Sequence, residues 1–329
     1  MTEPDKATAK DTKRDPSQWE LRQPYSAKLV LGLMVCAVLL AWSAKRTELD
    51  RGALQTVNGT AGEGVEEFFK AAWPLVFAER TEVSRIENFN PDDLPPLAHI
   101  EQEPVREFDA IANKWTESGT TDILVQPGGY VVRVVVLMFK TLEIAFWGTL
   151  LAIFMAIPLG YLSTAGYSPH PLVYTAARGL CSFNRAVPEL ISAMFFVLMY
   201  EPGPVPGVLA LGLHGSGFLG KFFADDAENA PSGPQQALLA TGAGRLKTMR
   251  FAVIPQVIPQ YLAYVQYVLE RNVRTGTVLG IVGAGGIGME LKGRWDLHDW
   301  GHVSTILLII FLAVIVLEHI TQRLRTRVM

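Results

Sequence analysis

The sequence predicts an all-α polytopic membrane protein with about six membrane-spanning helices. Hydrophobic residues make up 49% of the 329 residues and charged residues only 19%, against roughly 25% charged residues in a typical soluble domain. The stretch 144–177 contains no Asp, Glu, Lys or Arg. Apolar runs that reach or approach the length of a bilayer span lie at 29–44, 137–164, 172–200, 205–223, 251–269 and 302–320.

The first apolar run, 29–44, lies between Lys28 and Lys45. The polar leader before it is long for a signal peptide, and Trp42 stands where a cleavage site needs a small side chain. We therefore interpret the run as an uncleaved anchor rather than a signal peptide. Its length corresponds to about 24 Å of helix, so we expect its ends to extend and the flanking lysines to snorkel.

Basic segments predict the topology. The arm 1–28, the loop 245–250 and the tail 323–329 are all rich in Lys and Arg, which accumulate on the cytoplasmic side of a membrane. An even number of spans returns both termini to that side, so both are predicted to be cytoplasmic. The hydrophilic stretch 45–129 is then a periplasmic insertion, because loops of this length translocate regardless of their charge. Within it, amphipathic helices are predicted at 63–78 and 104–116.

Several function classes are disfavoured. A net charge of -3 and a pI near 6.1 give no indication of a nucleic-acid partner. Cys36 and Cys181 lie in apolar runs, as small hydrophobic side chains do. We predict no catalytic residues, no metal site and no cofactor in this chain, and the chain has no Walker phosphate loop. The motif Gly-x-Gly-x-x-Gly at 283–288 suggests a dinucleotide site, but no alternating strands and helices follow it. We interpret its glycines as allowing a broken segment to pack closely against neighbouring helices.

The most informative stretch is 235–255, between two predicted spans on the basic side. Its small residues at 240–244 allow a sharp turn between two short helices. The residues alone are also compatible with an ordinary connecting loop.

The spacing from Gly242 to Pro255 resembles the signature cytoplasmic loop of ABC importer permeases, which reads Glu-Ala-Ala, three residues, Gly, nine residues, Ile-x-Leu-Pro. Ala237 matches the first alanine, whereas Gln236 replaces the glutamate and Ala252 the isoleucine. The resemblance implies that 236–250 is a coupling helix that inserts into a groove of an ATPase subunit. The coupling residues that it implies are Gln236, Ala237, Thr241, Gly242, Ala243, Arg245, Leu246 and Pro255.

Four further stretches are similar to phosphonate-importer permeases, at 141–151, 183–191, 207–224 and 270–288. The resemblance extends over about 137–325 and implies a type I, MetI-like permease core of five helices plus the N-terminal anchor. The permease domain is then 130–322, with its coupling loop at 225–250. The resemblance also implies a homodimer in the bacterial inner membrane, two ATPase subunits that bind ATP and Mg, and a periplasmic binding protein. The implied cargo is phosphonate or a related phosphorus oxyanion, moved by alternating access.

Charged and polar residues near the spans form a candidate substrate pathway. Arg185 and Glu189 are four residues apart and are expected to pair on one helix face. Arg271 and Arg274 offer planar donors suited to an oxyanion. Internal ion pairs or interface anchors explain the same charges. The candidate pathway residues are Arg185, Glu189, Glu270, Arg271, Asn272 and Arg274. A secondary transporter or channel uncoupled from ATP is the alternative class, but it predicts inverted repeats, and we find none in the sequence.

Overall fold

The computed structural model describes residues 27–47, 60–87, 89–91, 94–95, 97–109 and 114–328. The chain divides into two compact units, Met1–Phe69 and Lys70–Met329. Nearly all of the predicted basic arm 1–28, and the last residue of the tail 323–329, lie outside the described residues.

The predicted anchor is confirmed as helix α1, Ala27–Arg46, of 20 residues. It is longer than the apolar run at both ends, and Lys45 and Arg46 lie in its last turn, where cations interact favourably with the helix dipole. Every residue of 30–43 is exposed. A helix that is apolar all round has the character of a membrane segment.

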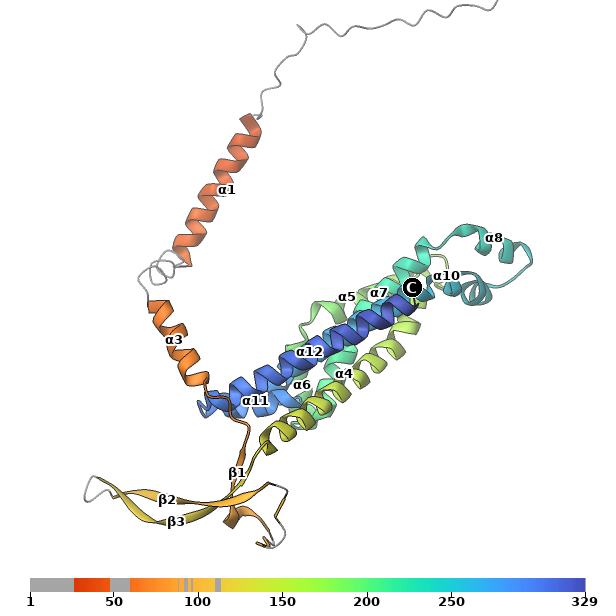
Figure 1. Ribbon diagram of the computed structural model, residues 1–329. Helices are drawn as coiled ribbons and strands as arrows, with labels where there is room; N and C mark the ends of the chain where they lie inside the picture. The colour runs from red at the N-terminus through yellow and green to blue at the C-terminus, as the bar shows by residue number, and fades with distance from the viewer. Residues whose placement is uncertain are drawn as a thin grey trace, which may run out of the picture. The chain divides into compact units, whose positions relative to one another are not determined.

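The insertion contains one helix and a small sheet (Figure 1). Helix α3, Thr60–Ala72, confirms the first predicted amphipathic helix, although it ends earlier than expected. The helix predicted at 104–116 is wrong. That region contains strands β2, His99–Asp109, and β3, Lys114–Gln126, which pair antiparallel. Together with β1, Glu79–Glu82, they form a three-stranded sheet in the order β1-β3-β2. Pro104 is tolerated because β2 is an edge strand.

Helices occupy each of the predicted membrane runs. They are α4 (Gly129–Leu162), α5 (Pro171–Ala186), α6 (Glu189–Tyr200), α7 (Pro204–Asn229), α10 (Ile254–Leu279) and α12 (Trp300–Val328). Within the described residues, α4 and α12 are long and apolar enough to cross a membrane, and the bent pair α5 and α6 is a third candidate. The prediction of one continuous span at 172–200 is wrong, because α5 and α6 meet at 89°. The break lies at Pro188, which cannot donate a helix hydrogen bond and disfavours the α conformation of the residue before it.

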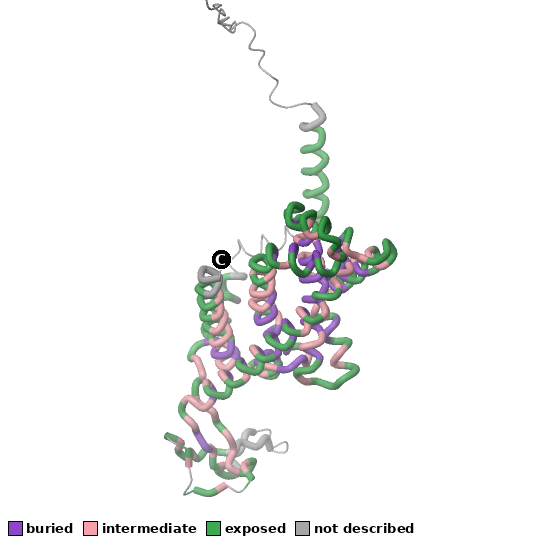
Figure 2. Tube along the Cα trace, turned by 90° about the vertical axis from the view of Figure 1, so that its right-hand side faces the viewer, coloured by how far each residue is buried: buried purple, intermediate pink, exposed green. Residues whose placement is uncertain are grey.

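Glycines bring α4 and α7 into close contact. A Cβ atom on Gly212 would lie 2.5 Å from Leu151 Cδ2, and one on Gly215 would lie 2.8 Å from Ala152 Cβ. Glycine disfavours helix interiors, yet α7, Pro204–Asn229, is one continuous helix, and several of its glycines allow its backbone to approach α4. Figure 2 shows the buried residues along the interior of this bundle.

The glycine-rich segment after α10 is also a packing device. A short 3₁₀ turn, Gly280–Val282, leads through 283–286 into α11, Ile287–Asp296. A Cβ atom on Gly288 would lie 2.1 Å from the Thr277 carbonyl oxygen, and one on Gly286 would lie 2.4 Å from Thr141 Oγ1. The close-packing interpretation of the motif is therefore confirmed.

Replacing Gly288 with alanine is expected to reduce sharply the yield of folded protein, because the added methyl group meets backbone atoms that cannot rotate away. Overpacking of this kind costs about 1–3 kcal/mol or more. The matched control is Gly293→Ala in the same helix, where a Cβ atom meets nothing within 4 Å. Fluorescence-detected size-exclusion chromatography would measure both variants, and equal yields would contradict the packing account.

Candidate functional site

The predicted coupling loop forms two short helices joined by a tight turn. Helix α8, Ser232–Ala240, ends at Thr241, and α9, Arg245–Thr248, begins after Gly244. The Ala243 amide donates to the Leu238 carbonyl over 3.2 Å, and the Gly242 amide donates to the Leu239 carbonyl over 3.0 Å. This is the hydrogen-bond pattern of a Schellman motif. Gly242 has φ +80°, which glycine adopts without a steric penalty.

Most of the predicted coupling residues lie on an exposed surface. Leu246 is 67% exposed and Leu239 is 51% exposed, although both are apolar. Uncovered apolar side chains beside basic ones are typical of a protein interaction site. The predicted coupling residues that are exposed around the turn are Gln236, Ala237, Thr241, Gly242, Arg245 and Leu246. Ala243 is half-buried in the turn itself.

Pro255 lies apart from the turn, in the first turn of α10, where the missing amide of proline is least costly. A π turn, Met249–Val253, precedes it. Such turns accommodate irregularities in helical hydrogen bonding. The spacing from Gly242 to Pro255 therefore fixes where the loop joins the membrane helix.

The predicted coupling loop is hydrogen-bonded to the connection between α4 and α5 and packs against the helices behind it. Tyr167 donates from its hydroxyl to Gln235 Oε1 over 2.8 Å, and Arg245 donates to the Ser168 carbonyl over 3.3 Å. Met249 and Val253 pack in a buried cluster with residues of α7 and α10. Figure 1 shows α8 at the opposite end of the helix bundle from the strands. A force applied to the loop would therefore reach α7 and α10 directly.

A charged network lies where α6, α7 and α10 meet. Glu189, the first residue of α6, forms an ion pair with Arg271 of α10. His214 of α7 lies 3.4 Å from the same carboxylate through Nε2, and its Nδ1 is 3.2 Å from the Val187 carbonyl. The expected pairing of Glu189 with Arg185 is wrong, because the break at Pro188 turns α6 away from α5. Arg185 is exposed and makes no ion pair with the residues that the structure describes.

The other pathway candidates lie on α10. Asn272 is buried and donates to Thr149 Oγ1 over 2.9 Å, so it holds α10 against α4. Arg274 is half exposed and pairs with Glu270 one turn earlier over 3.0 Å. Arg274 and Glu189 line the same cavity of about 350 Å³. The structure thus brings together five of the six candidates near α10 and separates Arg185 from them.

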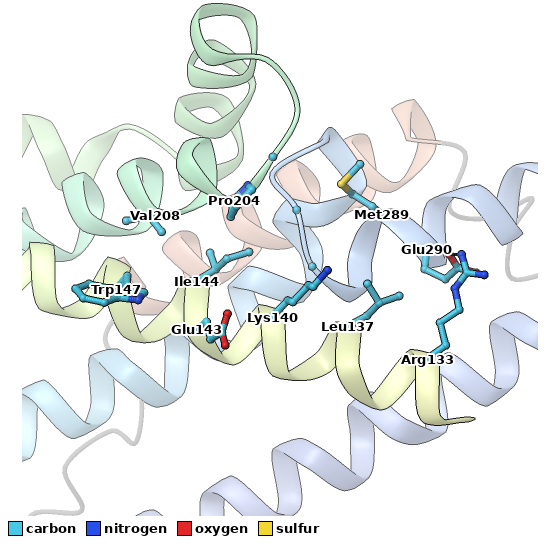
Figure 3. A pocket seen from close by; sticks show the side chains of 13 residues that line it. Arg133, Leu137, Lys140, Glu143, Ile144, Trp147, Pro204, Val208, Met289 and Glu290 are labelled. Atoms are coloured by element: carbon cyan, nitrogen blue, oxygen red, sulfur yellow. Dashed lines mark hydrogen bonds and ion pairs between the residues drawn. The ribbon is translucent and has the colours of Figure 1, made fainter. Parts of the chain in front are cut away.

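A larger cavity, of about 750 Å³, lies between α4, the start of α7 and the glycine-rich segment (Figure 3). Leu137, Ile144 and Val208 give it apolar walls, and the charged residues Lys140 and Glu143 line it as well. The sequence-based site did not include these two charges. The sequence did contain a signal for them, because two charged residues inside the apolar run 137–164 are unusual.

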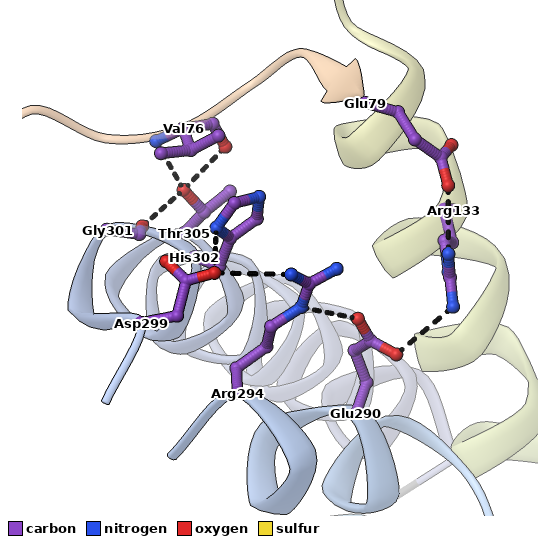
Figure 4. A network of polar contacts seen from close by, with 9 residues as sticks. All are labelled: Val76, Glu79, Arg133, Glu290, Arg294, Asp299, Gly301, His302 and Thr305. Carbon is purple, nitrogen blue, oxygen red and sulfur yellow. Dashed lines mark hydrogen bonds and ion pairs between the residues drawn. The ribbon is translucent and has the colours of Figure 1, made fainter. Parts of the chain in front are cut away.

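A second charged network joins the insertion to the outer ends of the helices (Figure 4). Arg133 of α4 pairs with Glu79 of β1 over 2.8 Å and with Glu290 of α11 over 3.3 Å. Arg294 connects Glu290 to Asp299 over 3.0 and 3.2 Å. Burial raises the pKa of Asp299, but the nearby His302 and Arg294 outweigh it, and the net effect lowers that pKa.

The segment directly before β1 is also hydrogen-bonded to α12. Thr305 donates from Oγ1 to the Val76 carbonyl over 2.9 Å and accepts from the Val76 amide over 3.1 Å. Together with the network around Arg133, these bonds make residues 76–79 part of the outer end of the bundle.

Comparison with known proteins identifies the class. Residues 148–328 match the family described as binding-protein-dependent transport system inner membrane component, which covers more than half of the chain. The chain belongs to this family, the permease subunits of ABC importers, as the resemblance of its coupling loop implied. The alternative of a secondary transporter or channel is thereby disfavoured.

Several of its relatives are named for phosphite or phosphate transport systems. The chain is 48% identical over 259 residues to HtxE of Stutzerimonas stutzeri, named for a phosphite transport system, covering 78% of this chain and 99% of HtxE. It is 40% identical over 188 residues to the phosphite transport system permease protein PtxC of the same organism, covering 57% of this chain and 68% of PtxC. It is 44% identical over 160 residues to the phosphate-import permease protein PhnE of Mycolicibacterium smegmatis, covering 49% of this chain and 30% of PhnE.

Solved structures confirm the predicted fold class. An inward-facing methionine ABC transporter, MetNI, aligns with a TM-score of 0.52 at 18% identity, covering 60% of this chain and 96% of that one. At this identity the likeness shows the fold alone. The permease core is therefore MetI-like, and the sheet 79–126 is the part of the chain that departs from all-α architecture.

Proposed function

We propose that the chain, as a homodimer with two ATPase subunits and a periplasmic binding protein, imports a phosphorus oxyanion across the bacterial inner membrane. The coupling loop is the observation that carries this proposal. It combines a glycine-dependent turn, uncovered leucines, hydrogen bonds to the connection between α4 and α5, and packing against α7 and α10. The phosphite and phosphate systems named for the relatives support the substrate class. ATP and Mg would bind only to the ATPase subunits.

The mechanism follows from these attachments. Closure of the ATPase dimer on ATP moves the coupling loop, and the loop moves α7 and α10 with it. The 89° bend between α5 and α6 provides a place where the bundle changes shape, since hinges lie at the ends of elements. Glu189, Glu270, Arg271, Asn272 and Arg274 lie along α10 and the start of α6, and we propose that they line the route. Arg185, outside this group, belongs to the proposed pathway only if the bundle rearranges.

The proposed orientation places both termini and the coupling loop in the cytoplasm. The loop carries Arg245, Lys247 and Arg250, in agreement with the preference of basic residues for the cytoplasmic side. Because the 34 residues of α4 extend over about 51 Å, its start and the preceding sheet would lie on the periplasmic side. There the sheet would stand beside the incoming binding protein.

Binding and transport of a panel of oxyanions tests the substrate class. The complete complex would be reconstituted with its binding protein and offered phosphite, methylphosphonate, phosphate and sulfate. We expect ATP-dependent uptake of at least one of the phosphorus anions and no uptake of sulfate. Uptake of none of the three phosphorus anions would overturn the proposed substrate class.

A further inference from the structure

Helix α4 carries two charges directly before the part of its sequence that contains no Asp, Glu, Lys or Arg. Lys140 and Glu143 lie within the apolar run 137–164, and the charge-free stretch begins at residue 144. Within the described part of the chain, neither side chain has an ion-pair or hydrogen-bond partner. A charge beside a membrane span is costly unless water, a partner or a ligand solvates it, so an unpaired one is a candidate functional group.

Both charges line the cavity of about 750 Å³ rather than a flat lipid-facing surface. Figure 3 shows them on the stretch of α4 between Leu137 and Trp147, with the Lys140 ammonium reaching away from the helix. Arg133, the other cation of this cavity, is already paired with Glu79 and Glu290. Among the described cavity residues, Lys140 is therefore the cation available to a ligand.

The opposite wall of the cavity offers backbone donors. Gly285 and Gly286 line it, with φ +84° and +73°. Their amides make no hydrogen bond within the described residues, and α11 begins directly after them. The N-terminus of a helix favours negative charge. An ammonium facing free amides at a helix start is the donor set that suits a small tetrahedral oxyanion.

We propose that this cavity is an oxyanion subsite on the transport route, in which Lys140 binds the anion together with the Gly285 and Gly286 amides. The assignment rests on the proposed function for its substrate class. When the subsite is empty, the negative charge of Glu143 balances the positive charge of Lys140. When an anion is bound, the same carboxylate repels it and weakens binding. Weak binding suits a transport pathway, because the subsite must also release the transported anion.

The test uses the complete reconstituted complex and whichever of phosphite, methylphosphonate or phosphate the unmodified complex transports. Lys140→Met is expected to lower the number of anions transported per ATP hydrolysed by about tenfold or more, the loss expected for one charge-assisted hydrogen bond. Lys140→Arg should recover much of it. The control is Lys221→Met, a lysine of α7 that does not line this cavity, for which we expect unchanged transport.

Two further variants keep the inference falsifiable if Lys140→Met assembles poorly. Glu143→Gln should tighten the apparent affinity for the anion, because it removes the competing carboxylate. The charge swap Lys140→Glu with Glu143→Lys should remain inactive. Restored transport by the swap would show that the two charges serve as a pair, within one copy or between two, and would overturn the subsite.

Failure of this inference is distinguishable from failure of the proposed function. Unchanged transport by Lys140→Met, or unchanged affinity in Glu143→Gln, would overturn the subsite alone. An unmodified complex that transports none of the three phosphorus anions would overturn the substrate class and the subsite with it.

Discussion

Replacing Gly242 with tryptophan is expected to abolish co-purification of the ATPase subunit and to reduce ATP-driven uptake to background. Gly242 has φ +80° in the turn between α8 and α9, where a side chain on the backbone is strained. No other group lies within 4 Å of its Cβ position, so the indole would project into the space that a docked partner needs. Affinity purification of the complex measures the first effect and radiolabelled uptake the second.

The matched control is Gly128→Trp, at the start of α4. Gly128 also has a left-handed backbone, φ +79°, and open space around its Cβ position. Backbone strain is therefore comparable, but the position lies at the other end of α4 from the coupling loop. ATPase association should survive this change. Intact association in the Gly242→Trp variant would contradict the docking role of the turn.

Replacing Arg271 with methionine is expected to produce the largest loss of stability. Arg271 is the ion-pair partner of Glu189, and both side chains are about four-fifths buried. Removing one partner of such a pair leaves an uncompensated charge, at a cost of about 3–5 kcal/mol. The corresponding fall in Tm is on the order of 10 °C for a domain of this size. Thermal unfolding of the detergent-solubilised protein measures it.

A second variant separates the lost pair from lost packing. Glu189→Gln combined with Arg271→Met removes both charges and should recover most of the Tm. The control is Arg274→Met, which removes a half-exposed partner of Glu270 on the same helix and should cost at most about 0.5 kcal/mol. A Tm for Arg271→Met equal to that of Arg274→Met would contradict the account of the network.

The membrane helices were predictable from sequence because burial in lipid excludes charge over long runs. Helices occupy each predicted run, and α1 even extends beyond its run as snorkelling lysines require. The break between α5 and α6 was signalled by Pro188, but its angle depends on which neighbours cover each half. Glu189 pairs with Arg271, which lies 82 residues away in the sequence, and local spacing favoured Arg185 instead.

The sheet was not predicted, for a different reason. Residues 104–116 have an amphipathic helical period, but strand pairing between β2 and β3 determines their structure, and it includes a register shift at Val105. Pairing with a partner strand is a tertiary effect that overrides local propensity. The stretch 120–125 is rich in β-branched residues, among them Thr120, Thr121 and Val125, and this was the available signal for a strand.

The local structure of the proposed coupling loop was predicted, whereas the large cavity was missed. Gly242 marked the turn after α8 and Pro255 the start of α10, because a left-handed turn and a helix start each favour a particular residue. Lys140 and Glu143 were passed over because charges inside an apolar run do not reveal which of them have partners. The structure supplies that information through the cavity that both residues line.

The central claim is that import depends on ATP through the coupling loop, and reconstituted transport tests it most directly. Uptake of a phosphorus oxyanion would be measured in proteoliposomes containing the permease alone, and in others containing the permease with its ATPase and binding protein. We predict uptake only in the complete system with ATP, and its loss in the Gly242→Trp variant. Uptake by the lone chain without ATP would contradict the account.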